Sequence, residues 1–194
     1  MTKIIAFDGI DGVGKTTLIS NIYTHLLAQN ISVELLALPH GAIRTMMLAG
    51  GLSDTIAIAG AVLGQATLFL ESLKPCEYLL IDRYSASAYV YQWAEEQDLA
   101  RRQTLARVID LYPKPDLHVW LRAKDTLAAA KRIPDHKRNR FDPDGGNKSA
   151  FRQRQYEAYY GQETKHCPVL TLTDSVVENM AVEAIWSAMA RKVG

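Results

Sequence analysis

Short apolar runs rich in β-branched residues alternate along the chain with longer stretches in which apolar residues recur every three or four positions. The short runs cover residues 3–7, 32–38, 78–81, 117–121 and 169–172. The longer stretches cover residues 15–29, 54–73, 85–97, 99–110, 124–132, 148–162 and 175–191, and their spacing is that of amphipathic helices. Strands that alternate with helices predict an α/β fold in which helices cover both faces of a parallel sheet of five strands.

Two of the short runs include a stretch of three or four residues without any polar residue, which predicts strands that are buried on both faces and lie centrally in the sheet. They are Ile4-Ile5-Ala6-Phe7 and Leu79-Leu80-Ile81. In an open parallel sheet, ligands bind outside the carboxyl ends of such strands. We therefore expect a three-layer α/β/α arrangement with its ligand crevice at that edge.

Residues 133–148 form the one long segment that reads as a loop, with two prolines, two glycines and several charged residues. Because no linker or repeat accompanies it, we expect a hinged flap, here called the lid, within a single domain of residues 1–194.

The overall composition narrows the classes of partner. Hydrophobic residues make up 48% of the chain, charged residues 22%, and the formal net charge is +1. This balance gives no electrostatic reason to expect a nucleic acid or a membrane as partner. The apolar run at the N-terminus is too short for a signal peptide, so we expect a cytoplasmic protein.

The segment from Gly9 to Thr16 matches the phosphate-binding motif G-x-x-x-x-G-K-[ST] between a predicted strand and a predicted helix. Its glycines let the backbone wrap around phosphates, and the helix N-terminus offers N–H groups to an anion. We expect Lys15 to reach the β- and γ-phosphates of ATP and Thr16 to bind Mg²⁺. The residues expected to contact ATP here are Gly9, Asp11, Gly12, Val13, Gly14, Lys15 and Thr16. Thr17 is either a further contact or a packed residue of the first helical turn.

This P-loop occurs in kinases, GTPase switches and ATP-driven machines alike. A GTPase is disfavoured because the nearest match to its base-reading motif N-K-x-D, Asn147-Lys148-Ser149-Ala150, lacks the aspartate.

A second motif, Asp82-Arg83-Tyr84, ends a predicted central strand and is followed by Ser87 and by Tyr91-Gln92. This pattern resembles the D-R-[YH] and S-x-x-x-Y-Q of the thymidylate kinases. Phe7-Asp8-Gly9-Ile10-Asp11-Gly12 is similar to the F-E-G-I-D-G of the same family. Weaker matches, from Pro39 and Arg44 through Phe69 to the arginine-rich lid, extend the resemblance over most of the chain.

The resemblance implies an ATP-dependent nucleoside monophosphate kinase with the P-loop NTPase fold, Mg²⁺ as cofactor and a homodimeric assembly. Arg83 and Arg44 would bind the acceptor phosphate. Pro39 and Ser87 would line the acceptor site, Phe69 would stack on the acceptor base, and Tyr91 would lie against the deoxyribose. Arg132, Arg138 and Arg140 would close on ATP from the lid, the last two as catalytic groups.

Asp8 and Asp82 are the carboxylates nearest the P-loop, and each can hold Mg²⁺ or bind the 3′-hydroxyl of the acceptor. Thr16 with Asp82 is our candidate metal pair.

Some positions depart from the family pattern. Leu70-Glu71-Ser72-Leu73 stands where the family has A-x-D-R, whose arginine reads the base, and Ala37-Leu38-Pro39 replaces R-E-P. Three functions therefore stay open: phosphorylation of dTMP or a related deoxynucleoside monophosphate, a deoxynucleoside kinase, and a nucleotide-binding regulatory protein without catalysis.

Overall fold

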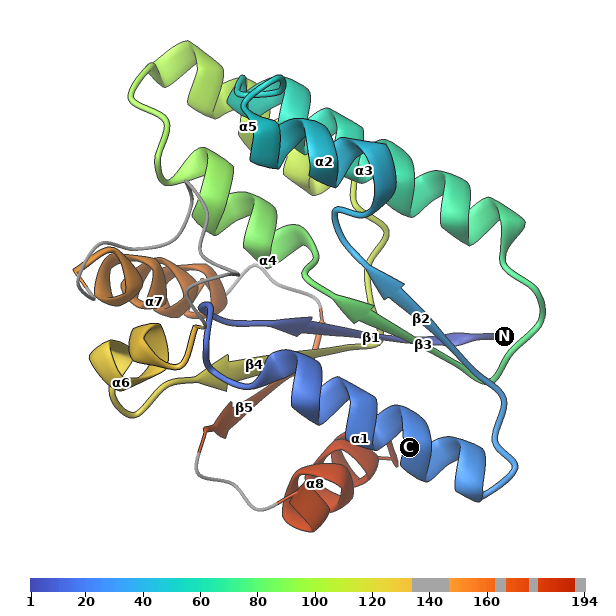
Figure 1. Cartoon of the computed structure of the whole chain (residues 1–194). Coiled ribbons are helices and arrows are strands. Elements are labelled where there is room, and N and C mark those ends of the chain that lie inside the picture. Colours follow the sequence, from blue (N-terminus) through green and yellow to red (C-terminus); the bar gives the residue numbers. More distant parts are fainter. Residues whose placement is uncertain (134–146, 163–166, 175–177, 191–194) are drawn as a thin grey trace.

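The computed structural model describes residues 1–133, 147–162, 167–174 and 178–190. Its five strands form one parallel sheet in the order β2-β3-β1-β4-β5, and they are β1 (Lys3–Asp8), β2 (Val33–Ala37), β3 (Tyr78–Asp82), β4 (Leu117–Arg122) and β5 (Val169–Thr173). Helices α1 (Lys15–Ala28) and α8 (Glu178–Ala190) cover one face of this sheet, as Figure 1 shows.

The other face is covered by α3 (Thr55–Ser72), α4 (Ser85–Ala88), the π-helix η1 (Tyr89–Trp93) and α5 (Leu99–Asp110). The shorter α2 (Gly41–Ala49), α6 (Thr126–Lys131) and α7 (Asn147–Tyr160) lie toward the carboxyl ends of the strands (Figure 1). The predicted α/β/α fold with five parallel strands is confirmed.

The two runs without polar residues are central, as predicted. Ile5, Ala6 and Phe7 of β1 are fully buried, as are the three apolar residues of β3. The register pairs Phe7 with Asp82, so the ends of β1 and β3 lie side by side. The P-loop after β1 and the Asp82-Arg83-Tyr84 motif after β3 therefore open into the same crevice.

Two helical features differ from the predictions. The expected helix over residues 85–97 is a single α-helical turn followed by η1, in which the Ala94 N–H donates to the carbonyl of Tyr89, five residues back, at 2.9 Å. Helix α2 was not predicted, because its helical set of apolar residues, Ile43, Met46 and Met47, falls within only nine residues, and Met47 alone is buried.

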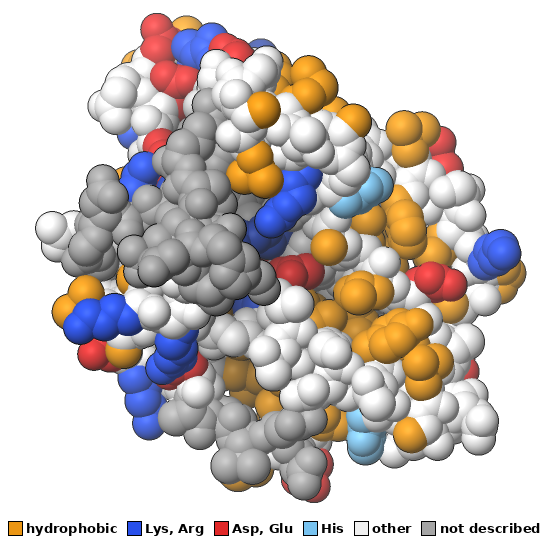
Figure 2. Space-filling model, viewed as in Figure 1, with side chains coloured by type: hydrophobic (Ala, Val, Ile, Leu, Met, Phe, Trp, Pro, Cys, Tyr) orange, Lys and Arg blue, Asp and Glu red, His pale blue; other side chains and the backbone are white. Residues whose placement is uncertain are grey.

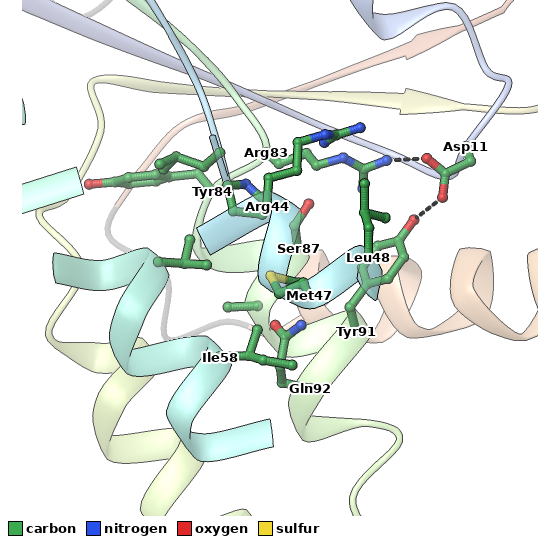
Figure 3. A pocket seen from close by; sticks show the side chains of 14 residues that line it. Asp11, Arg44, Met47, Leu48, Ile58, Arg83, Tyr84, Ser87, Tyr91 and Gln92 are labelled. Atoms are coloured by element: carbon green, nitrogen blue, oxygen red, sulfur yellow. Dashed lines mark hydrogen bonds and ion pairs between the residues drawn. The ribbon is translucent and has the colours of Figure 1, made fainter. Parts of the chain in front are cut away.

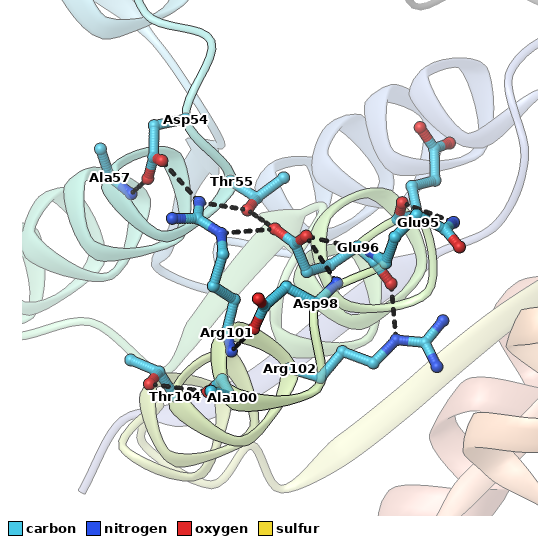
Figure 4. Close-up of polar contacts among 11 residues, drawn as sticks. Asp54, Thr55, Ala57, Glu95, Glu96, Asp98, Ala100, Arg101, Arg102 and Thr104 are labelled. Atoms are coloured by element: carbon cyan, nitrogen blue, oxygen red, sulfur yellow. Dashed lines mark hydrogen bonds and ion pairs between the residues drawn. The ribbon is translucent and has the colours of Figure 1, made fainter.

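The N-termini of α3 and α5 are tied together by a cluster of polar side chains, shown in Figure 4. Asp54 caps α3 by accepting a hydrogen bond from the Ala57 N–H at 2.9 Å. Arg101 of α5 donates to Asp54 at 2.5 Å and to Glu96 at 2.9 Å. Hydrogen bonds from Thr55 and Arg101 lower the pKa of Glu96 to about 2, so this carboxylate stays charged at neutral pH.

Candidate active site

The P-loop joins β1 to α1 through a backbone path that requires glycine at two positions. A Cβ atom on Gly9 would lie 2.4 Å from the Leu121 carbonyl oxygen, and one on Gly12 would lie 1.9 Å from that of Ala129. Both residues also have positive φ angles, 149° and 76°. The loop is thus wrapped tightly against β4 and α6, and no side chain caps the N-terminus of α1. Its free N–H groups can therefore face an anion.

Lys15 is buried inside this loop. Its ammonium donates to the carbonyl oxygens of Gly9 at 2.8 Å and Ile10 at 3.0 Å. Burial, with the nearby guanidinium of Arg83, lowers the pKa of Lys15 to about 8, although Asp11, Asp82 and Asp8 oppose the shift. The cradle thus holds a cation next to the helix N-terminus, where phosphates bind.

Thr16 and Asp82 come together across the crevice. The Thr16 hydroxyl lies 3.3 Å from Oδ2 of Asp82, and the other carboxylate oxygen is buried without a hydrogen-bond donor among the described residues. A buried carboxylate oxygen that lacks a donor, next to a hydroxyl, suits a hard cation with oxygen ligands such as Mg²⁺.

Arg83, Asp11 and Tyr91 form a second cluster beside the P-loop. The Arg83 guanidinium is ion-paired with Asp11, and the Tyr91 hydroxyl donates to the other oxygen of Asp11 at 2.8 Å. Arg83 adopts a φ of 68°, which is uncommon for a residue with a side chain. Its N–H also bonds to the Phe7 carbonyl at 2.9 Å, so β1 fixes this strained turn.

The charges of this cluster support each other. Burial raises the pKa of Asp11, but Arg83, Lys15 and the Tyr91 hydroxyl lower it more, so the net pKa is well below the usual range. Burial alone would lower the pKa of Arg83. The negative charge of Asp11 outweighs burial and raises this pKa well above its ordinary value, so the guanidinium stays charged. Burial, with the charge of Asp11, raises the pKa of Tyr91 to about 12.

A pocket runs from this cluster toward α2 and α3 (Figure 3). One end is polar and the other is apolar, and the lining residues are Asp11, Leu38, Pro39, Arg44, Met47, Leu48, Ile58, Val62, Arg83, Tyr84, Ser87, Ala88, Tyr91 and Gln92. Figure 3 shows the side chains of Arg44 and Arg83 at the polar end. The pocket therefore offers two guanidinium groups at one end and an aliphatic slot at the other.

A separate groove lies on the opposite side of the P-loop. It has a volume of about 290 Å³ and is lined by Gly12, Val13, Gly14, Thr17, Leu18, Asn21, Leu121, Arg132, Leu172, Thr173, Asp174 and Ala181. Arg132 donates to Asp174 at 3.0 Å and so spans the groove. The residues that the sequence predicts as ATP contacts therefore lie in two different cavities. Asp11 lines the pocket described above. The groove is lined by Gly12, Val13, Gly14, Thr17 and Arg132.

Asp8 lies deeper than the pocket. It is fully buried and does not line the pocket. Its Oδ1 accepts from the Ser87 hydroxyl at 2.6 Å and from the N–H groups of Ser87 and Tyr84 at 3.1 Å, and its Oδ2 accepts from the Tyr160 hydroxyl. Burial raises the pKa of Asp8, but His118 and these hydrogen bonds lower it more. Asp8 therefore anchors the start of α4 through these hydrogen bonds.

Phe69 also lies outside the pocket. It is absent from the pocket lining and packs against the smaller core cluster, which includes Leu36, Ala66 and Ile81. The side chains of α3 that do reach the pocket are Ile58 and Val62. Their spacing of four residues on an apolar helix was the available signal, but an aromatic residue was expected instead.

The remaining predictions are placed as follows. Pro39, Arg44, Ser87 and Tyr91 line the pocket, whereas Arg138 and Arg140 lie outside the described residues. Met47 and Gln92 were not singled out as binding residues, although Gln92 belongs to the quoted motif.

Figure 2 shows that Lys and Arg side chains lie mostly toward the carboxyl ends of the strands on this face. The face thus presents cations on the side where the crevice opens.

Comparisons with known proteins agree with this geometry. The family model described as "Thymidylate kinase" matches residues 7–181. A thymidylate kinase of Bifidobacterium longum is 27% identical over 95% of this chain and 94% of its own length. A thymidylate kinase of Acinetobacter baylyi is 27% identical over 80% of this chain and 82% of its own.

Among solved structures, a deoxyadenosine kinase from M. mycoides with dCMP and dCDP bound has a TM-score of 0.73, at 17% identity. The alignment covers 97% of this chain and 99% of that one, and at this identity it shows a shared fold. Taken with the family match, it identifies a phosphotransferase with the fold of the P-loop kinases. The chain is a nucleoside monophosphate kinase, and it belongs to the thymidylate kinase family.

Proposed function

We propose that this protein transfers the γ-phosphoryl group of ATP, with Mg²⁺, to dTMP or a closely related pyrimidine deoxynucleoside monophosphate. The observation that carries the proposal is the Arg83–Asp11–Tyr91 cluster, which stands between the P-loop and an apolar slot. Phosphoryl transfer needs two phosphates held in line and their charge neutralised, and a cluster in this place can do both.

The phosphate groups would be bound by three basic side chains, a helix N-terminus and a metal ion. Lys15 and the N-terminus of α1 would hold the β- and γ-phosphates of ATP. Arg83 and Arg44 would bind the acceptor phosphate, since planar guanidinium groups bind phosphate oxygens in pairs. Thr16 and Asp82 would hold Mg²⁺, which neutralises charge on the β- and γ-oxygens when bound.

The donor nucleoside would lie in the groove beside the P-loop. Arg132 spans this groove in its pair with Asp174, and its planar guanidinium can stack on an adenine ring. From the lid, Arg138 and Arg140 would add positive charge at the transferring phosphorus.

The acceptor base would enter the aliphatic slot. Met47, Leu48, Ile58 and Val62 line it without a charged side chain, and the Gln92 amide supplies one donor and one acceptor group. A pyrimidine presents a complementary donor and acceptor along one edge, so a single amide can pair with it. Tyr91 would then lie against the deoxyribose and leave little room for a 2′-hydroxyl.

The proposal includes a cytoplasmic homodimer. Helix α3 is long and apolar enough to cross a membrane, but core helices of globular proteins also meet these two criteria. Only 17% of its residues are buried. Its exposed positions include Ala57, Gly60 and Leu68. Because α3 also supplies Ile58 and Val62 to the pocket, we assign its uncovered apolar face to a second copy of the chain. Sedimentation velocity tests this assembly, and a monomer at micromolar concentration would contradict it.

The activity is tested by an ADP-release assay with ATP and a panel of common deoxynucleoside monophosphates, ribonucleoside monophosphates and unphosphorylated deoxynucleosides. We expect turnover with dTMP above the other acceptors and weak turnover with ribonucleotides. Turnover with deoxynucleosides alone would instead establish a deoxynucleoside kinase. Tight ATP binding without turnover on any acceptor would favour a regulatory protein.

A further inference from the structure

A buried cation lies behind the acceptor pocket and outside its lining. The side chain of Arg152, on α7, is 2% exposed, and its Nε and Nη2 donate to Oε1 of Glu95 at 3.1 and 2.9 Å. Its guanidinium carbon lies 4.2 Å from the centre of the Tyr91 ring. Burying a guanidinium costs solvation free energy that an apolar side chain would not lose, so stability alone is a weak reason for this residue.

The stacking of Arg152 on Tyr91 connects it to the phosphate-binding end of the pocket. Tyr91 also has the guanidinium of Arg83 at 5.1 Å from its ring centre, and its hydroxyl donates to Asp11, the ion-pair partner of Arg83. Arg152, Tyr91, Asp11 and Arg83 therefore form a continuous chain of contacts, here called the relay.

The charge of Arg152 extends along this relay. Burial raises the pKa of Asp11, yet the charges of Arg83, Lys15 and Arg152 together with the Tyr91 hydroxyl lower it below its usual value. Asp11 thus stays ionised and keeps Arg83 oriented. A planar guanidinium can stack on a ring in a way that an ammonium cannot, which makes lysine a specific probe of the stacking.

The first two members of the relay, Arg152 and Tyr91, belong to different parts of the fold. Tyr91 lies in η1, whereas Arg152 lies in the second turn of α7, the helix that begins at Asn147 after the predicted lid. Glu95 follows η1 and fixes the guanidinium from the η1 side. The position of α7 is thereby linked to the orientation of Tyr91.

We propose that Arg152 is a positioning residue for phosphoryl transfer, which holds Tyr91 and through it the Asp11–Arg83 pair in the geometry that meets the acceptor phosphate. The inference rests on the proposed function for the identity of the acceptor. It adds a residue that touches neither nucleotide.

The test compares Arg152→Lys with Arg154→Lys, a matched control on the exposed side of the same helix. Calorimetry measures the binding of dTMP and of thymidine, which lacks the phosphate. We expect Arg152→Lys to weaken dTMP binding about tenfold and thymidine binding by a clearly smaller factor, because thymidine keeps only the deoxyribose contact of Tyr91, whereas the relay ends at the phosphate ligand Arg83. The KM for ATP and all constants of Arg154→Lys should stay near those of the wild type. Equal weakening of dTMP and thymidine, or none, would overturn the proposal.

A double-mutant cycle tests the route of the effect. In a Tyr91→Leu background the ring is gone, so Arg152→Lys should change dTMP binding by less than about twofold. An undiminished effect in that background would show that Arg152 does not act through Tyr91.

Two further measurements keep the test decisive. Thermal unfolding identifies a variant that fails to fold. If Arg152→Lys fails to fold, Glu95→Gln, which removes the charge that fixes Arg152, takes its place, and dTMP binding should again weaken more than thymidine binding.

If the wild type transfers phosphoryl to no acceptor, the proposed function fails. Inorganic phosphate is then titrated into protein saturated with AMP-PNP. Weaker phosphate binding by Arg152→Lys would still support the relay, and unchanged or absent binding would overturn it.

Discussion

The hydroxyl of Thr16 lies 3.3 Å from a carboxylate oxygen of Asp82, although 66 positions separate the two residues in the chain. The parallel pairing of β1 with β3 brings them together, because it aligns the P-loop with the end of β3. The pair offers a hydroxyl and a charged oxygen at one point, and the second oxygen of Asp82 has no donor within the described part of the chain.

Asp82→Asn should therefore lower kcat by about two orders of magnitude, because the neutral amide no longer holds a divalent cation at this position. The Mg²⁺ concentration required for half-maximal activity should rise in parallel. A steady-state titration with MgCl₂ at saturating ATP and acceptor measures both effects. Wild-type Mg²⁺ dependence in the variant would remove Asp82 from the metal site.

The lowered pKa of Lys15 predicts that, as the pH rises above 8, catalytic activity falls while the contribution of Lys15 to stability increases. Burial lowers its pKa from 10.5 to about 8, so above pH 8 the ligand-free enzyme loses the ammonium and kcat/KM for ATP should fall. Between pH 8 and 10.5 the unfolded chain binds a proton that the folded chain does not, so the contribution of Lys15 to stability should rise with pH.

A pH profile of kcat/KM for ATP tests the first sign, and the Tm difference between the wild type and Lys15→Met tests the second. A flat profile through pH 8, or a Tm difference that moves against the wild type as pH rises, would contradict the assignment.

Tyr91→Phe should raise the KM of the acceptor roughly tenfold and leave the KM of ATP unchanged, because it removes one hydrogen bond to the charged Asp11 and keeps the ring. The pKa of Tyr91, raised to about 12, means that the effect should not vary with pH near neutrality. Tyr89→Phe, in the same π-helix but outside the pocket, is the control. A loss of ATP affinity in Tyr91→Phe would place the residue in the donor site.

Phe69 and Ile58, both on α3, should behave differently when shortened to alanine. Phe69→Ala should lower the free energy of unfolding by about 2 to 4 kcal/mol through a cavity in the smaller core, with the KM values of ATP and acceptor unchanged. Ile58→Ala should raise the acceptor KM, because Ile58 lines the pocket. Denaturant unfolding and steady-state kinetics separate the two effects, and an acceptor KM raised by Phe69→Ala would restore the stacking role.

The fold could be predicted because its signals are local. The fully apolar runs of β1 and β3 specify central strands, and the P-loop specifies the turn between β1 and α1. Helix α2 escaped prediction because its nine residues leave room for only one i, i+3, i+4 set of apolar side chains, which is a weak helical signal. The π-helical turn escaped because the apolar residues of 85–97 fit an α-helix equally well.

The site could be predicted only where its residues are fixed by backbone geometry. Lys15, Thr16 and Asp82 follow from the strand ends to which they are attached. The places of Phe69 and Asp8 outside the pocket lining could not be predicted, because side-chain direction on α3 and the depth of β1 depend on how distant elements pack. Arg152 gave no signal, since a buried arginine in a charged, weakly amphipathic helix looks like a solvated residue.

The π-helical turn at η1 contains one residue more than an α-helix would need. Removing a single residue from 89–93 would let the turn close into regular α-helix, and the residues on either side would keep nearly their present directions around the axis. The same deletion in a regular α-helix would rotate every side chain beyond it by about 100°. The chain can therefore lose a residue at this turn without turning the rest of the helix, whereas Tyr91 and Gln92, which lie within the turn, would change their place relative to Arg83.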